Sequence, residues 1–301
     1  MKHPKMETLK NCPVCDSNSF SAFLEVEDFF LTHEKFSLVK CNTCNFVFTN
    51  PRPSENDLGK YYQSIEYISH SSSTISFKDK VYYSVRNYTI KQKFKLIGKH
   101  CKNGSILDIG CGTGEFLNFF KLKGWNTTGI EPNNSARKTA VEKYRLNIHI
   151  EEQLDKFKDS SFDVITMWHV LEHVPDLKKR IQQIKSLINE NGVLIIAVPN
   201  IDSKDAKTYG KFWAALDIPR HLYHFNQSTI KKLFENSGFE LKEILPMKFD
   251  AFYISMISEK YKTGKANYIK AIYYGLKSNF YGASHKNNYS SNIYVLKLKN
   301  R

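Results

Sequence analysis

The sequence has no apolar run long enough to cross a membrane as a helix. Its lysine-rich beginning also lacks the apolar stretch and the small-residue cleavage site of a secretory signal peptide. Aspartate and glutamate are absent from Lys260 onwards, where nine lysines and arginines occur. The first two absences argue against a membrane-spanning helix and against a secreted chain. We therefore expect a cytoplasmic protein with a basic C-terminal region.

The 301 residues have 41% hydrophobic content and a formal net charge of +14. A chain of this size can bury one good-sized core with room for a small appendage. The positive charge favours anionic partners such as nucleotide-linked substrates, nucleic acid or an anionic membrane surface. Lysines spread over solvated faces would explain it equally well. The basic C-terminal region, interleaved with tyrosines, could receive a phosphorylated acceptor or lie peripherally on an anionic membrane.

Cysteine is scarce, and four of the six cysteines form two C-x2-C pairs, Cys12 with Cys15 and Cys41 with Cys44. In a reducing compartment this spacing indicates a metal site rather than disulfides. Each pair can direct two thiolates at one point, so together they predict a tetrahedral zinc site. Four thiolates leave no open position for a substrate, and the zinc is therefore expected to be structural. The Asn50–Pro53 segment breaks the chain and ends this small domain, predicted as residues 1–53.

A glycine-rich turn separates an apolar segment from a helical pattern within Ser105–Phe120. The stretch predicts a strand, a tight loop and a helix start, which together bring backbone N–H groups close to a ligand. The third glycine of the turn, Gly114, comes one place too early for the G-x-G-x-x-G fingerprint of dinucleotide binding. Acids at Asp108 and Glu115 would repel a pyrophosphate and favour a ligand with a cationic end.

The pattern hD-h-G-x-G-x-G in this stretch resembles that of class I S-adenosylmethionine-dependent methyltransferases. The order of elements extends the resemblance from about Phe94 to Asn200. It implies an α/β fold with a doubly wound, Rossmann-like sheet of seven strands. Glu131, 23 residues after Asp108, stands where an acid accepts hydrogen bonds from both ribose hydroxyls. The expected cofactor-binding residues are Asp108, Gly110, Cys111, Gly112, Gly114, Glu131, Pro132, Trp168, His169 and Tyr67.

Alternation of strand and helix predicts the rest of the sheet. An amphipathic helix is expected over 177–189, ended by Asn191-Gly192. The other strands are expected at 126–130, 147–150, 162–166 and 193–198, with a closing antiparallel pair at 239–247 and 292–298.

The remaining segments complete the predicted domain organisation. Residues 54–100 are predicted as lid or linker helices, with Tyr62 and Tyr67 as candidates to touch cofactor or acceptor. Residues 101–301 form the predicted methyltransferase domain, with a helical insertion at about 250–290.

Two clusters of polar residues follow strands and are candidates for acceptor chemistry. The first includes His169, Glu172 and His173, an H-x-x-E-H pattern. A zinc protease would need that pattern on a continuous helix, whereas here it follows a strand end with Pro175 close behind. The second cluster lies past the fifth strand, in a loop where acceptor chemistry is expected. The expected catalytic residues are His173, His221, Arg220, Tyr223 and Asp217.

Histidine titrates near working pH, so His173 or His221 is the expected general base. Arg220 could pair with an acceptor phosphate or carboxylate. The competing interpretation is a salt-bridged loop that braces the site.

The layout resembles zinc-binding methyltransferases that act on nucleotide sugars and surface glycans. In the sugar C-methyltransferases among them the acceptor loop carries a Tyr and a Glu-His pair. Here His221 matches and Arg220 departs, which removes the acid that would help to form an enolate. The core also resembles quinone-type O-methyltransferases, which carry E-x-x-E-H after the fourth strand. His169 replaces their first Glu, which argues against a divalent metal at this position.

The sequence therefore predicts S-adenosylmethionine-dependent methyl transfer to a small or glycan-type acceptor, which is expected to be anionic. Such acceptors include a sugar, a nucleotide-sugar or a lipid-linked saccharide of polysaccharide biosynthesis, with O-methylation ahead of C or N. One alternative is an RNA methyltransferase that grips phosphates with its cysteine domain and basic tail. Nucleic acid is not the expected partner, because Val198–Asn200 is a poor match to an N-P-P-Y motif. The other alternative is a module that binds cofactor or partner without catalysis. The oligomeric state stays open.

Overall fold

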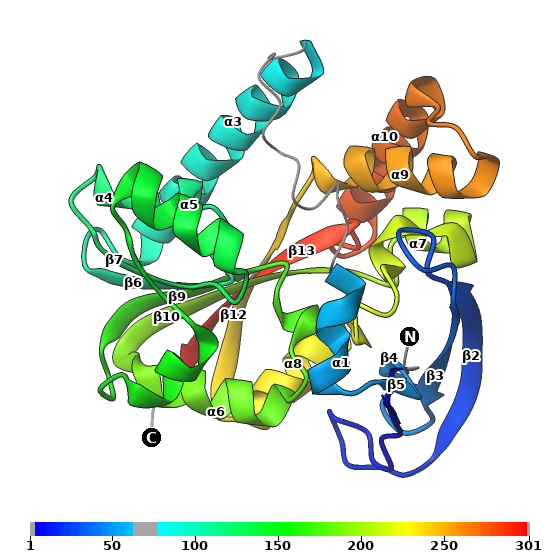
Figure 1. Cartoon of the computed structure of the whole chain (residues 1–301), viewed down its shortest axis with the longest axis horizontal. Coiled ribbons are helices and arrows are strands. Elements are labelled where there is room, and N and C mark those ends of the chain that lie inside the picture. The colour runs from blue at the N-terminus through cyan, green and yellow to red at the C-terminus, as the bar shows by residue number, and fades with distance from the viewer. Residues whose placement is uncertain (1–3, 63–76, 300–301) are drawn as a thin grey trace. The chain divides into compact units, whose positions relative to one another are not determined.

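A computed structural model describes residues 4–62 and 77–299, and Figure 1 labels their helices and strands. The chain divides into two compact units. Unit 1 comprises Met1–Gln63, His169–Lys179 and Ile196–Val295. Unit 2 comprises Ser64–Trp168, Arg180–Ile195 and Leu296–Arg301. The domain limits expected at residues 53 and 100 stay predictions.

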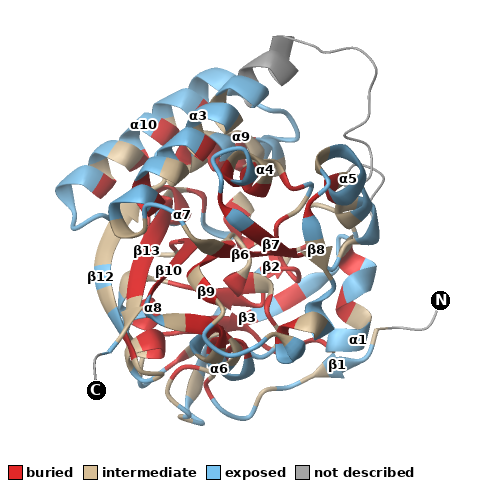
Figure 2. Cartoon of the chain, turned by 90° about the vertical axis from the view of Figure 1, so that its left-hand side faces the viewer, coloured by how far each residue is buried: buried red, intermediate tan, exposed pale blue. Residues whose placement is uncertain are grey.

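The seven-stranded sheet predicted from the sequence is present, with the strand order β12-β13-β10-β9-β6-β7-β8. Pairs β6–β7, β6–β9 and β7–β8 are parallel, as in doubly wound α/β folds. Strands β9, β10 and β13 are mostly buried (Figure 2). The strands are β6 (Ser105–Ile109), β7 (Asn126–Ile130), β8 (Asn147–His149), β9 (Phe162–Trp168), β10 (Ile188–Pro199), β12 (Phe239–Pro246) and β13 (Ser291–Leu298).

Some helices begin at residues that cap them, and α5 is an example. The side chain of Asn133 accepts a hydrogen bond from the backbone N–H of Ala136 and caps α5. Gly114 precedes α4 with a φ of 85°. Leu107 of β6 and Ile165 of β9 have no exposed surface and lie in the core of unit 2. The elements are α3 (Phe77–His100), α4 (Glu115–Lys121), α5 (Asn134–Tyr144), the 3₁₀ helix η2 (Glu151–Lys156) and α6 (Leu177–Leu187).

The predicted boundary between the helix after the fourth strand and the fifth strand is wrong. The helix expected to reach Asn189 ends at Leu187, and β10 already begins at Ile188 rather than at Val193. Bonds to distant residues extend the chain here: Asn189 Nδ2 donates to Asp163 Oδ1 at 2.6 Å, and Ser161 N donates to Leu187 O at 2.9 Å. The Asn-Gly pair at 191–192 therefore lies within a strand instead of ending a helix.

Unit 1 contains a four-stranded antiparallel sheet with the order β11-β4-β3-β2. Three of its strands come from the cysteine-containing segment: β2 (Phe20–Glu27), β3 (Lys35–Cys41) and β4 (Val47–Thr49). The fourth, β11 (Tyr223–His224), comes from the loop of the second polar cluster and pairs Tyr223 with Phe48 and His224 with Val47. No local pattern in the sequence predicted this pairing. A second, two-stranded sheet joins β1 (Met6–Glu7) to β5 (Arg52–Pro53).

Unit 1 also contains several helices. The helices expected near 251–261 and 267–276 are α9 and α10, which lie side by side in Figure 1. No helix in the described ranges has both the length and the apolar content needed to span a membrane. The elements are α1 (Glu55–Leu58), η1 (Gly59–Tyr62), η3 (Leu171–His173), α7 (Lys204–Tyr209), η4 (Gly210–Phe212), η5 (Ala214–Leu216), α8 (Gln227–Glu235), α9 (Asp250–Thr263) and α10 (Tyr268–Ser284).

Candidate functional site

The glycine turn between β6 and α4 has the conformation that the sequence predicted. Gly112 has a φ of 56° and Gly114 one of 85°, in the left-handed region that favours glycine. A Cβ at Gly114 would lie only 2.6 Å from Leu146 Cδ1 and 2.9 Å from Ala140 Cβ. Gly110 N donates to Ile130 O at 2.7 Å, which ties the turn to β7. The turn therefore needs glycine and is held against the second strand.

Glu131 follows β7 directly and has only 8% of its surface exposed. Its Oε2 accepts a hydrogen bond from Gly112 N at 2.8 Å, and its Oε1 accepts one from Asn133 N at 2.8 Å. Burial raises the pKa of this carboxyl, while the two backbone N–H groups oppose the rise. Each oxygen keeps a lone pair, so the carboxylate can still accept from the two hydroxyls of a ribose. The geometry fits the role expected for Glu131.

Asp108 is also buried, but its carboxyl bonds to the neighbouring strand. Its Oδ1 accepts a hydrogen bond from Thr166 Oγ1 at 2.6 Å. Burial raises the pKa of Asp108 to about 7. The expected role of Asp108 in cofactor binding stays a prediction, and the observed bond joins β6 to β9.

Trp168 ends β9, and its Nε1 is buried without a hydrogen-bond partner among the described residues. Lys93 Nζ lies 3.8 Å from the centre of one face of the indole, and Phe116 packs against the ring edge-to-face. Cys111 is buried in the glycine turn, and Pro132 O accepts a hydrogen bond from Arg137. Tyr67 lies outside the described residues.

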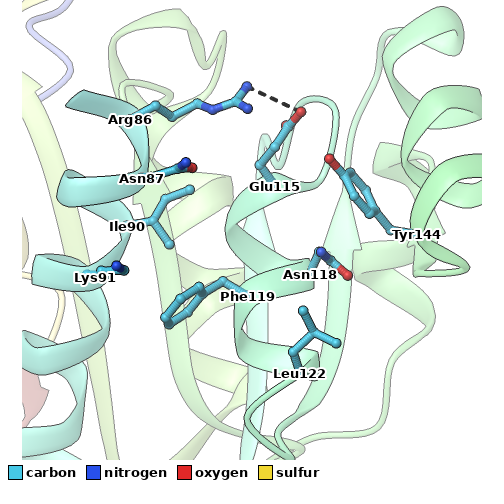
Figure 3. Close-up of a pocket in the computed structure, with 9 residues that line it drawn as sticks. All are labelled: Arg86, Asn87, Ile90, Lys91, Glu115, Asn118, Phe119, Leu122 and Tyr144. Carbon is cyan, nitrogen blue, oxygen red and sulfur yellow. Dashed lines mark ion pairs between the residues drawn. The ribbon is translucent and has the colours of Figure 1, made fainter. Parts of the chain in front are cut away.

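A cavity of about 340 Å³ lies between α3 and α4 in unit 2 (Figure 3). Glu115 Oε1 forms an ion pair with Arg86 Nη1 across it at 3.3 Å. The acid at the start of α4 is therefore neutralised by α3 rather than left to face a cationic ligand. None of the expected cofactor-binding residues lines this cavity. The lining residues are Arg86, Asn87, Ile90, Lys91, Glu115, Asn118, Phe119, Leu122 and Tyr144.

The four cysteines of the two C-x2-C pairs meet in unit 1. Their sulfur atoms all lie within 4.8 Å of one another, and both Cys12–Cys44 and Cys15–Cys41 are separated by 3.6 Å between Sγ atoms. These distances are too long for disulfide bonds. Four thiolates bound tetrahedrally at about 2.3 Å from a zinc ion would lie about 3.8 Å apart. The observed spacing therefore suits zinc.

Arg220 lies at the centre of a buried ion cluster in unit 1. Its Nη2 donates to Asp217 Oδ1 and to Asp28 Oδ1, each at 2.8 Å, and its Nη1 donates to Tyr61 O at 3.1 Å. The arginine is 4% exposed and Asp28 is 1% exposed. These bonds brace the second polar cluster against the hairpin of β2 and β3. Acceptor binding by Arg220 or Asp217 stays a prediction.

The two histidines expected to act as bases are neighbours, with ring centroids 4.5 Å apart. His173 Nδ1 lies 3.0 Å from Arg220 O and 2.9 Å from the Tyr62 hydroxyl. Because a carbonyl can only accept, Nδ1 carries the proton and the lone pair is on Nε2. Burial and the neighbouring His221 lower the pKa of His173 to about 4. His173 is therefore a neutral imidazole at pH 7, as a general base requires.

Glu172 completes this cluster. It is 1% exposed, and neither carboxylate oxygen has a hydrogen-bond partner within the described chain. Burial alone would raise the pKa of Glu172. The nearby histidines lower it by more, so the net shift is downward. One donor atom from each of Glu172, His173 and His221 lies within 4.8 Å of the others. Two imidazoles and one carboxylate can also bind a divalent ion such as zinc or manganese.

Several contacts of these clusters could not be read from the sequence. Tyr223, expected to be catalytic, donates a hydrogen bond to Pro175 O at 2.8 Å and accepts one from Arg52 Nη1 at 2.7 Å. His169, expected beside the cofactor, forms an ion pair with Asp250 at 2.9 Å. Although burial lowers the pKa of His169, Asp250 raises it well above its usual value. Tyr223 and His169 are therefore each held in place by polar neighbours that the sequence did not indicate.

His224, the other histidine of the second polar cluster, was not among the expected catalytic residues. It is 4% exposed, and its Nε2 has no hydrogen-bond partner among the described residues. The sequence signal was its place in that cluster, three residues after His221.

Comparison with known proteins identifies the family. A family model described as "Methyltransferase domain" matches residues 82–244. A ubiquinone biosynthesis O-methyltransferase of Coxiella burnetii is 34% identical over 126 residues, which cover 40% of this chain and 52% of that protein. Its counterpart in Glaesserella parasuis is 31% identical over 165 residues, covering 48% of this chain and 69% of that protein. The chain thus spans about half the length of the Coxiella relative.

Solved structures show the same fold. Magnesium protoporphyrin IX methyltransferase from Synechocystis, with bound SAH, has a TM-score of 0.53 and 14% identity, covering 82% of this chain and 100% of that chain. A SAM dependent methyltransferase from Archaeoglobus fulgidus has a TM-score of 0.50 and 20% identity, covering 70% and 94%. Since the family model matches more than half of the chain, the chain belongs to the methyltransferase-domain family.

Proposed function

We propose that the chain transfers a methyl group from S-adenosylmethionine to a hydroxyl oxygen of a small acceptor. Membership of the methyltransferase-domain family supports methyl transfer, and the glycine turn with Glu131 supports the cofactor. The observation that carries the choice of oxygen is His173, a buried imidazole with its lone pair on Nε2. The curated relatives are named as O-methyltransferases, which agrees with this choice.

The proposed roles follow from the contacts of each group. The glycine turn and the Glu131 carboxylate bind the cofactor, which supplies a methyl group already activated on its sulfonium. His173 removes the acceptor proton at Nε2, since an amine acceptor with a free lone pair would not need such a base. Glu172 lies beside the imidazole and stabilises the imidazolium that forms. The Arg220 carbonyl and Tyr62 hold the ring from its other nitrogen.

We further propose that the acceptor is a saccharide or nucleotide-sugar and that the four-cysteine site holds structural zinc. The saccharide is supported by the combination of a four-cysteine segment with His221 in the acceptor loop, as in the sugar methyltransferases that the sequence resembles. The zinc is supported by the sulfur spacing in unit 1. A phenolic acceptor is the competing candidate, because ubiquinone biosynthesis is named for the relatives.

A product assay tests the proposal. The full chain is incubated with S-adenosylmethionine and two panels of acceptors, nucleotide sugars with glycan fragments and catechol-type phenols, and methylated products are identified by mass spectrometry. An O-methylated sugar is the expected product. An O-methylated phenol would overturn the saccharide but keep the reaction. If the chain binds the cofactor and methylates neither panel, a third incubation supplies RNA as the acceptor. Methylated RNA would then establish the RNA alternative, and no product in any incubation would favour the non-catalytic alternative.

A further inference from the structure

Helix α10 in unit 1 places its small residues inside and its large apolar residues outside. The buried residues are Ala271, Gly275, Ser278 and Gly282, which recur at helical spacing along one face. A Cβ at Gly275 would lie 2.5 Å from the Phe252 ring, so this face packs closely against α9. The opposite face carries Ile269, Ile272, Tyr273, Leu276 and Phe280, with 83%, 55%, 58%, 46% and 74% of their surfaces exposed.

This distribution is the reverse of what packing within a single chain favours. Large aliphatic and aromatic side chains normally supply the buried face of an amphipathic helix, because their burial contributes most to stability. Their spacing of three, four, seven and eleven residues from Ile269 keeps them on one continuous stripe along α10. Figure 2 shows the outer surface of this helix mostly in the colour of exposed residues. A stripe of this kind marks a surface that contacts another body.

The charged residues beside the apolar stripe indicate which kind of surface the stripe contacts. Lys270 and Lys277 are exposed and seven residues apart, so they lie together along one side of the apolar stripe. The sequence from Lys260 to its end holds nine lysines and arginines and no acid. An apolar stripe flanked by cations complements a surface with an apolar interior and a negative rim. A second copy would bring lysines against lysines, and nucleic acid would leave the aliphatic residues of the stripe without an apolar partner.

We propose that α10 docks on an anionic lipid bilayer, with Ile269, Ile272, Leu276 and Phe280 in the acyl boundary and Lys270 and Lys277 at the headgroups. The helix lies in the plane of the interface and does not span the membrane. This proposal is independent of the identity of the methyl acceptor. Docking would concentrate the protein where lipid-linked molecules are found.

Vesicle sedimentation tests the proposal. The full chain is mixed with vesicles of phosphatidylcholine alone or with about one third phosphatidylglycerol, an anionic fraction large enough to give the negative surface potential that attracts basic segments. Binding is expected to be stronger by tenfold or more on the anionic vesicles and to weaken as salt is added. The double variant Ile269→Ser/Phe280→Ser should lower that binding by about tenfold or more, because the two side chains no longer enter the acyl boundary. Leu122→Ser is the matched control, because Leu122 is 75% exposed but belongs to unit 2.

Charge is tested separately with two variants of equal net charge. Lys270→Gln/Lys277→Gln should weaken binding to anionic vesicles by about tenfold, while Lys156→Gln/Lys158→Gln, at exposed positions of unit 2, should change it by less than about twofold. Equal binding to both kinds of vesicle, or equal losses in both lysine variants, would overturn the proposal. So would a concentration-dependent dimer that Ile269→Ser/Phe280→Ser dissociates, or RNA binding that the same variant removes.

Discussion

Arg220 Nη2 donates a hydrogen bond to Asp28 Oδ1 at 2.8 Å, although the two residues are 192 positions apart in the sequence. The same arginine carries, on its backbone, the carbonyl that accepts the His173 Nδ1 proton. One residue therefore joins the hairpin of the cysteine-containing segment to the proposed base. The position of that base depends on a segment that no local sequence pattern connects with it.

Breaking this bond should lower the stability of the chain. Asp28→Asn leaves the buried guanidinium with only one carboxylate, and the free energy of unfolding should fall by about 2 kcal/mol. Urea unfolding measures the effect. Asp16→Asn is the matched control, because Asp16 pairs with Lys178 at the surface, with side chains 63% and 61% exposed. That change should cost less than about 0.5 kcal/mol. Equal losses in both variants would contradict the importance of the buried pair.

Cofactor affinity should depend on Glu131. Glu131→Ala removes the acceptor for two ribose hydroxyls and also releases Gly112 N and Asn133 N, so the affinity for S-adenosylmethionine should fall about a hundredfold. Isothermal titration with S-adenosylmethionine and S-adenosylhomocysteine measures the change. Glu142→Ala is the control, since that side chain is 65% exposed and should leave the affinity unchanged. An unchanged affinity in Glu131→Ala would show that the cofactor binds elsewhere.

Replacing the proposed base should affect turnover and not cofactor binding. His173→Gln should lower kcat by about a hundred- to ten-thousandfold, with the S-adenosylmethionine Kd within about twofold of the original. Tyr62→Phe, which removes only the hydroxyl near Nδ1, should cost less than about tenfold. A divalent ion bound at one equivalent and lost on His173→Gln would instead assign His173 and Glu172 to a metal site.

Zinc should be present at one equivalent per chain and should influence acceptor use. Cys41→Ser should lose the metal by elemental analysis, whereas Cys101→Ser should retain it. Because β4 follows the cysteine turn and pairs with β11, loss of zinc should also raise the KM for the acceptor. The affinity for S-adenosylmethionine should change little, since Glu131 and the glycine turn belong to unit 2. Retention of zinc by Cys41→Ser would rule out the four-cysteine site.

Lowering the pH should destabilise the folded chain through the buried His224. Burial lowers the pKa of His224 to about 3, so the folded chain resists protonation that the unfolded chain accepts near pH 6.5. This residue's contribution to stability is therefore complete above pH 6.5 and is lost as the pH falls towards 3. Between pH 7 and pH 5.5 the natural chain should lose about 1 kcal/mol more of its free energy of unfolding than the His224→Asn variant does. Between pH 7.5 and 8.5 the difference should stay constant.

The sequence predicted those parts of the fold that local patterns encode. The glycine turn, Glu131 at the end of its strand and the alternation of strands with helices each depend on residues within a few positions of one another. The start of β10 and the pairing of β11 were missed because bonds to Asp163 and to Phe48 decide them. The roles expected for Arg220 and Tyr223 ignored buried partners for the same reason. Residue type alone could not show which polar groups were already hydrogen-bonded.

The pairing of β4 with β11 has a consequence for how the chain folds. Thr49 Oγ1 donates a hydrogen bond to the His221 carbonyl across 172 positions of sequence. During synthesis the cysteine-containing segment emerges before β11, and its sheet has an open edge until β11 follows. Closing so long a loop costs entropy before any contact compensates for it, which slows folding. Capture of zinc by the four cysteines would hold the early strands together over that interval and make the metal an aid to folding as well as to stability.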